Sequence, residues 1–222
     1  MAVAVDAVNT TDISFAAATT VSGTPITATA SATAVVASSV FGDNIGISTP
    51  TSVVVQWAAQ TLSIVTSADT GFHNGAINTS RAFLSTIGSP TTGAQTAKMT
   101  WTNTYAGYFN MMSWKGSDTT TPCKNGTATT ATSTAPSITV TSPTNDFAVG
   151  CMFDDSATIS GTNQTQWWVD TSRVNNGAAN YTAGAGSTTL STAAITSDFW
   201  GYAACDVQVP ASADVLMAQA TM

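Results

Sequence analysis

Residues 137–153 have the sequence SITVTSPTNDFAVGCMF, and this stretch decides the fold class. Ile138 and Val140 alternate with Ser and Thr, a period of two that is typical of a half-buried strand. Residues 142–146 bring Pro, Asn and Asp together, and these residues favour turns. From residue 147 to residue 153 the chain is almost entirely apolar, as in a core strand. The stretch therefore predicts two strands joined by a turn.

Comparable runs recur along the chain, with turn-forming pairs such as Asn125-Gly126 between them. The run 108–114 is more continuously apolar than the others, so we expect both of its faces to be covered. The Thr-rich stretch 127–136 fits a loop and sandwich edge better than a hinge between domains. Roughly nine to eleven short strands at fairly regular spacing predict an all-β sandwich or barrel. Further predicted strands begin near residue 3 and cover residues 26–36, 52–57, 97–102, 166–170, 187–190 and 199–207.

The composition supports this class and limits the function. Glutamate is absent, so all 12 acidic residues are Asp, while Lys and Arg together number 5. Thr fits strands, whereas the missing Glu and scarce Lys favour helices. Charged residues make up 8%, against about 25% in ordinary globular domains, so hydroxyls and amides must cover the surface. The net charge of -7 argues against nucleic-acid binding, which needs a basic face.

We expect no targeting segment within residues 1–222. No uninterrupted apolar run of about 18 residues occurs, so no membrane-spanning helix is expected. Residues 1–15 contain neither a basic start nor a compact apolar stretch, so no signal peptide is expected. A Thr-rich, extracellular type of composition without an export signal fits a virus particle that is released by lysis.

The three cysteines, Cys123, Cys151 and Cys205, are far apart in the sequence. Their spacing does not match a zinc site, and at most one intramolecular disulfide could form. We expect them to be reduced and buried, as small apolar side chains.

Catalytic chemistry has few residues to use. His73 is the only histidine, lies in a predicted turn, and has no accompanying nucleophile motif. Asp154 and Asp155 are the only adjacent acids, and such a pair could serve glycoside hydrolysis or, with Asn175 or Asn176, calcium binding. Neighbouring strand residues face opposite sides, so we expect solvated acids at a strand end. We predict no enzyme activity, no cofactor and no metal site.

Trp167 and Trp168 are adjacent on a predicted strand, so one is expected to face the core and the other solvent. An exposed tryptophan in polar surroundings suits a protein interface or a carbohydrate platform. Burial of both rings is the remaining alternative.

The order of features from Trp101 to Trp200 resembles a known domain. Trp101 ends one predicted strand, the 108–114 strand follows, and the turn sequence KGSDTTTP occupies residues 115–122. The strand at 137–141, the NDFAV, QTQWW and GAGST segments and a closing strand with Trp200 come next. This order resembles the jelly-roll-like domain of tailed-phage virion structural proteins, of capsid decoration or fibre type, over about residues 53–210. The resemblance implies one antiparallel β-sandwich of jelly-roll type over residues 1–222, with residues 1–15 as an arm or edge strand.

The resemblance, the low charge and the missing export signal together imply a virion structural protein. We expect a capsid-surface decoration (cement) protein on the outer surface of the phage head, with the major capsid protein as partner. A homo-oligomer is expected, with a trimer favoured by symmetric capsid positions. The alternative is a carbohydrate-binding module of a tail or head fibre, with a host-surface glycan as ligand. The contact residues that we predict are Val3, Val5, Phe15, Trp167, Trp168, Val215, Leu216 and Met217.

Overall fold

The computed structural model describes residues 2–9, 13–42, 50, 52–73, 78–155, 157–172 and 176–211, without the side chains of residues 17 and 69–79. These residues form sixteen strands and no helix, and every strand pairing among them is antiparallel. The predicted all-β class is therefore confirmed. Within this part of the chain, no helix has the length and hydropathy needed to cross a lipid bilayer.

The first sheet has seven strands, five of which close into a small barrel. In the ring, β9 pairs with β4, β4 with β7, β7 with β6, β6 with β5, and β5 pairs back with β9. β1 and β2 are additional partners of β9. The strands are β1 (Ala4–Val8), β2 (Ile13–Ser22), β4 (Ala32–Gly42), β5 (Val54–Trp57), β6 (Gln60–His73), β7 (Asn78–Gly88) and β9 (Ala97–Lys115).

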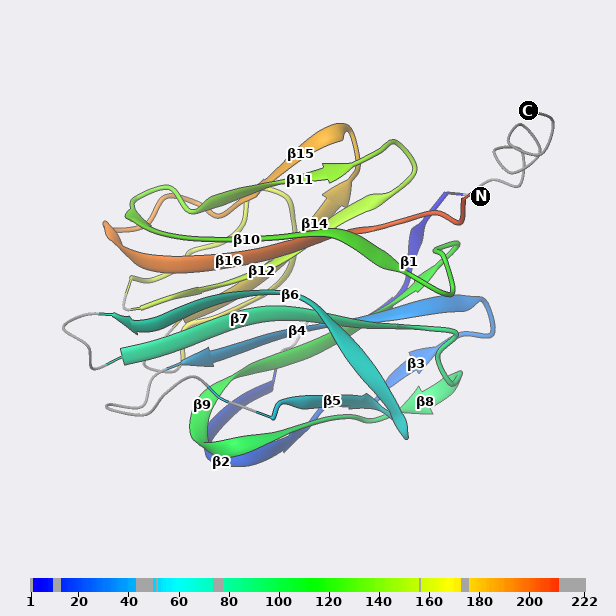
Figure 1. The fold of residues 1–222 in the computed structure, drawn as a ribbon, viewed down its shortest axis with the longest axis horizontal. Helices are drawn as coiled ribbons and strands as arrows, with labels where there is room; N and C mark the ends of the chain where they lie inside the picture. Colours follow the sequence, from blue (N-terminus) through cyan, green and yellow to red (C-terminus); the bar gives the residue numbers. More distant parts are fainter. Residues whose placement is uncertain are drawn as a thin grey trace.

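The second sheet has five strands in the order β10-β16-β12-β14-β13 and packs against the wall of the barrel, as Figure 1 shows. Two small sheets complete the fold, β11 with β15 and β3 with β8. The strands are β3 (Ile26–Ala28), β8 (Gly93–Gln95), β10 (Cys123–Ser133), β11 (Ser137–Ser142), β12 (Phe147–Asp154), β13 (Thr165–Asp170), β14 (Asn176–Ala183), β15 (Gly186–Ser191) and β16 (Asp198–Val207).

Strand alternation divides the buried side chains among three cores. On β4, Val35 and Phe41 face the inside of the barrel, whereas Val36 and Val40 face the five-stranded sheet. The third core lies between the other face of that sheet and the β11–β15 pair, where Leu190 is fully buried. Strands such as β4 and β12 are thus covered on both faces, which explains their continuous apolar sequences.

The 108–114 run is confirmed as a strand with two covered faces. Tyr108 and Met112 belong to the core between the sheets, and Phe109 and Met111 belong to the barrel interior. The run is the second half of β9, a 19-residue strand that also contains the predicted strand 97–102.

Candidate functional site

Trp167 and Trp168 are both buried, with 1% exposure each, so the prediction that one of them faces solvent is wrong. The pairing of β13 with β14 shifts register between Gln166 and Trp168, which places Trp167 at a β-bulge. A bulge breaks the alternation of side chains, so both rings enter the core between the two sheets. The indole N–H of Trp168 donates to the hydroxyl of Ser38 on β4 at 2.8 Å.

All six tryptophans of the chain are buried, so a carbohydrate platform of stacked, exposed indoles is not present. Of the other four, Trp57 and Trp101 lie in the barrel core. Trp114 lies in the core between the sheets, and Trp200 lies in the core under β11 and β15.

The predicted contact residues of the N-terminal segment belong to the fold. Val3 and Phe15 have 3% and 6% exposure and lie in two of the cores, and Val5 is half-buried at the edge of the core between the sheets. A side chain that is covered within its own chain has little surface for a partner, so Val3 and Phe15 act as core residues here. β1 is an edge strand of the seven-stranded sheet, with β9 as its partner. Val215, Leu216 and Met217 lie outside the described residues.

The acid pair at the end of β12 is buried, and the expectation of solvated acids is therefore wrong. Asp154 is fully buried and its Oδ1 accepts from the amide of Ala157 at 2.6 Å. The side-chain amide of Asn176 donates to the carbonyl of Ala157 at 2.6 Å. Asp155 has 7% exposure. These groups fix the turn after β12, and the described residues contain no group of three His, Cys, Asp or Glu that could hold a metal ion. His73 is the last residue of β6.

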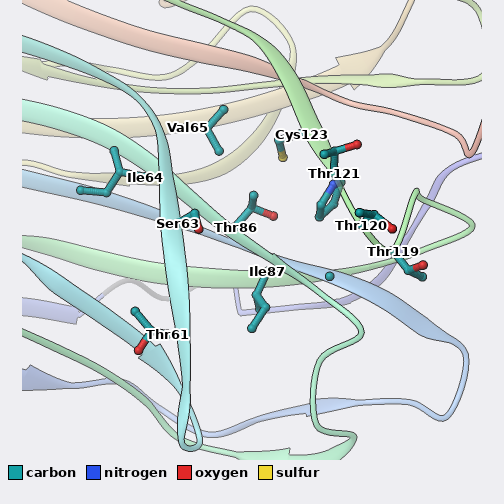
Figure 2. Close-up of a pocket in the computed structure, with 12 residues that line it drawn as sticks. Thr61, Ser63, Ile64, Val65, Thr86, Ile87, Thr119, Thr120, Thr121 and Cys123 are labelled. Atoms are coloured by element: carbon teal, nitrogen blue, oxygen red, sulfur yellow. The ribbon is translucent and has the colours of Figure 1, made fainter.

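A cavity of about 450 Å³ lies where β6 bends between its pairing with β5 and its pairing with β7, and its size is that of a small-molecule site. We call it the β6 cavity (Figure 2). The bend follows from a register shift at Val65, between Ile64 and Thr66. No lining residue is charged or aromatic, so the cavity suits a neutral ligand that can exchange hydrogen bonds with hydroxyls. Its lining is Thr61, Ser63, Ile64, Val65, Thr86, Ile87, Gly88, Thr119, Thr120, Thr121, Pro122 and Cys123.

One wall of the β6 cavity is formed by the predicted turn at residues 115–122, which side-chain hydrogen bonds hold in place. Asp118 Oδ1 accepts from the amides of Thr120 and Thr121 at 2.7 and 2.8 Å. The Asp118 amide donates to the carbonyl of Gln208 at 2.8 Å, which ties the segment to the chain after β16. Gly88 allows the close approach, since a Cβ there would lie 1.9 Å from the Thr119 carbonyl oxygen.

The outer face of the β11–β15 pair is a flat array of hydroxyls. Thr139 pairs with Thr189 and Thr141 with Ser187, and all four side chains are exposed. The hydroxyls of Thr139 and Thr189 are 3.0 Å apart. In the described chain no other strand extends this two-stranded sheet, so both of its outer edges lack a strand neighbour. We call this surface the hydroxyl face and define it as Ser137, Thr139, Thr141, Ser187 and Thr189.

Two carboxyl groups meet where β16 ends. Asp206 is fully buried and Asp146 has 2% exposure. Asp206 Oδ1 accepts from the Ser142 hydroxyl at 2.7 Å, and Asp146 Oδ1 accepts from the Val209 amide at 2.8 Å. Burial and the neighbouring Asp146 raise the pKa of Asp206 to about 7, although Ser142 and Lys124 act in the opposite direction. The pair therefore holds a proton under mildly acidic conditions.

Comparisons of the chain with protein-family models, with curated proteins and with solved structures gave no match.

Proposed function

We propose that the chain is a virion structural protein of a tailed phage, a decoration protein that binds the outer surface of the assembled capsid. The observation that carries the proposal is the hydroxyl face, an uncharged surface on a two-stranded sheet that no further strand of the described chain extends. Its edges are covered at one end each, where Ser191 bonds to Asn163 and Gln164 and Thr141 bonds to Asn125. Proteins usually protect exposed edges with charges, Pro or bulges. The paired strands β11 and β15, of six residues each, contain no charged residue and no Pro.

A strand edge without a neighbouring strand is suited to pairing with a strand of another chain. Main-chain hydrogen bonds would then supply affinity, and the hydroxyls would fit against a partner without the cost of burying charge. Binding to the mature lattice alone would stabilise that lattice by mass action. The finer fold assignment, an antiparallel sandwich of jelly-roll type, and the trimeric state are part of this proposal.

The proposal is tested by counting copies of the chain in purified particles with quantitative mass spectrometry. A ratio to the major capsid protein near one, or a simple fraction set by capsid symmetry, supports a decoration role. A few copies per particle would place the chain in a tail or fibre, and absence from particles would refute the virion role.

Thr139→Asp tests the hydroxyl face itself, because it puts one charge at the centre of the proposed contact. We expect the variant to lose co-sedimentation with capsids. Thr20→Asp is the matched control, since Thr20 is an exposed threonine on β2 in the other sheet. Equal binding of both variants would rule the hydroxyl face out as the contact.

A carbohydrate-binding role in a fibre is the second candidate, and the neutral, hydroxyl-lined β6 cavity favours it. Calorimetric titration with a panel of host glycans tests this role directly. No heat of binding across the panel would count against it, whatever the copy number in particles.

A further inference from the structure

All three cysteines lie on one face of the five-stranded sheet. β10, β16 and β12 are neighbours in that order, and they carry Cys123, Cys205 and Cys151 respectively. Cys123 stands opposite Val207, and Cys151 stands opposite Ala203, so the strand pairing sets all three side chains toward the core between the sheets. The fold thus brings together cysteines that are separated in the sequence by 28 and 54 residues.

The three thiols differ in access. Cys123 is half-buried and lines the β6 cavity, with its sulfur drawn in Figure 2, whereas Cys151 and Cys205 have no exposed surface. The side chain of Cys123 contacts that of Cys205 on the adjacent strand. Cys151 is one strand further on, and its thiol donates to the carbonyl of Phe83 at 3.3 Å.

We propose that Cys123 is a thiol–disulfide exchange site whose substrate is a small neutral disulfide bound in the β6 cavity, and that Cys205 is its resolving partner. The neutral lining of hydroxyls and aliphatic groups fits an uncharged, hydroxylated disulfide better than a charged one. Cys123 reacts with the substrate first because, of these two cysteines, it alone lines the cavity.

The exchange takes place in two successive steps. In the first, Cys123 loses its proton and its sulfur attacks one sulfur of the substrate, so that a mixed disulfide forms and one substrate thiol leaves with that proton. In the second, the Cys205 thiol gives up its proton and attacks the Cys123 sulfur, and the second substrate thiol leaves. The two protein thiols are oxidised to one internal disulfide, and the substrate disulfide is reduced to two thiols.

The second step is expected to be the slow one. Contact with Cys123 and burial raise the pKa of the Cys205 thiol well above its ordinary value, so its reactive thiolate is scarce at neutral pH. The strand pairing is irregular beside both thiols, because the register of β10 with β16 shifts between Lys124 and Thr127. A mixed disulfide at Cys123 should therefore accumulate before the internal disulfide forms.

The first test uses the wild-type protein. Native protein is treated with iodoacetamide and digested for mass spectrometry. We expect Cys123 to be labelled about tenfold or more faster than Cys151 and Cys205, because burial blocks attack on the other two thiols. Labelling of all three at similar rates would overturn the proposal.

The second test follows the reaction with bis(2-hydroxyethyl) disulfide by intact-mass and peptide mass spectrometry. Wild-type protein should show an adduct on Cys123 that converts to a Cys123–Cys205 disulfide. Cys205→Ala should keep the adduct, Cys123→Ala should form none, and Cys151→Ala should match the wild type. A Cys123–Cys151 disulfide, or conversion of the adduct in Cys205→Ala, would refute the role of Cys205.

The third test asks whether the substrate arrives through the β6 cavity. Ile64→Trp places a large ring in the cavity at a side chain that is 41% exposed, and Val54→Trp is the matched control at 37% exposure on β5. We expect Ile64→Trp to slow adduct formation about tenfold while Val54→Trp leaves the rate unchanged. Equal rates in the two variants would show that the cavity is not the route.

Discussion

The Asp146–Asp206 pair predicts that the folded chain loses stability as the pH rises from about 4 to about 7. The pKa of Asp206 is about 7 in the folded chain and 3.8 in a free aspartate. Below pH 4 both states carry the proton. Between these values the unfolded chain releases it while the folded chain keeps it, so each rise in pH favours unfolding. Above pH 7 the stabilising contribution is gone.

The magnitude follows from the difference of about three pH units. At about 1.4 kcal/mol per unit, the full contribution would be about 4 kcal/mol. Asp146 and Asp206 interact and titrate as a pair, so only part of this difference belongs to Asp206 alone. We therefore expect about half, or about 2 kcal/mol, to be lost between pH 4 and pH 8.

Asp206→Asn tests this directly, because asparagine has the shape of the protonated acid at every pH. Urea unfolding, followed by the fluorescence of the buried tryptophans, should show the variant about 2 kcal/mol more stable than wild type at pH 8 and about equal at pH 4. Asp170→Asn is the control, at the opposite end of β14 from the pair. Identical pH profiles for Asp206→Asn and wild type would refute the reasoning.

Three further substitutions test the packing, each by thermal or urea unfolding. Gly88→Ala should destabilise the fold by about 2 kcal/mol or more, since its Cβ would overlap the Thr119 carbonyl; unchanged stability would contradict the tight approach. Trp168→Phe should cost about 2–3 kcal/mol, because it empties core volume and leaves the Ser38 hydroxyl without its donor, and a cost below about 0.5 kcal/mol would argue against that contact. Asp118→Ala should cost about 1 kcal/mol from two lost hydrogen bonds, and it should also raise the proteolysis rate at residues 116–122.

Regular strands could be predicted from the sequence where one or both faces carry large side chains. The alternation at Ile138 and Val140 corresponds to β11, and the apolar run from Phe147 corresponds to β12. The turn at residues 142–146 could also be predicted, because Pro, Asn and Asp favour turns. In the structure the amide of Asp146 donates to the carbonyl of Pro143 across this turn.

Other strands were missed because small polar residues weaken the periodicity. β10 consists mainly of Ser, Thr and Ala, and β6 contains many of them, and these residues contribute little contrast between a buried and an exposed face. β9 was divided in two because its middle, residues 102–104, is exposed and polar, with a positive φ at Asn103. Barrel closure depends on the pairing of β5 with that same strand, a contact that no local pattern encodes.

The site depends even more on tertiary structure. The burial of both Trp167 and Trp168 results from a bulge, which is set by register with β14 and not by local sequence. The β6 cavity requires the bend at Val65 and the approach of segment 116–122 to Gly88. The convergence of the three cysteines requires the order of strands in the second sheet. The abundance of Ser and Thr in the sequence does not indicate which of them line a cavity.

The pairing of β9 with four strands has a consequence for synthesis of the chain. β1, β2, β4 and β5 all pair with β9. The ribosome completes β1, β2 and β4 at least fifty residues before β9 begins. Until residue 115 has left the exit tunnel, these low-charge strands lack their main partner. Nascent chains of this type expose strand edges that can associate with one another. Folding of the barrel is therefore expected to be late and cooperative during translation, and slow elongation before β9 should increase aggregation of the new chain.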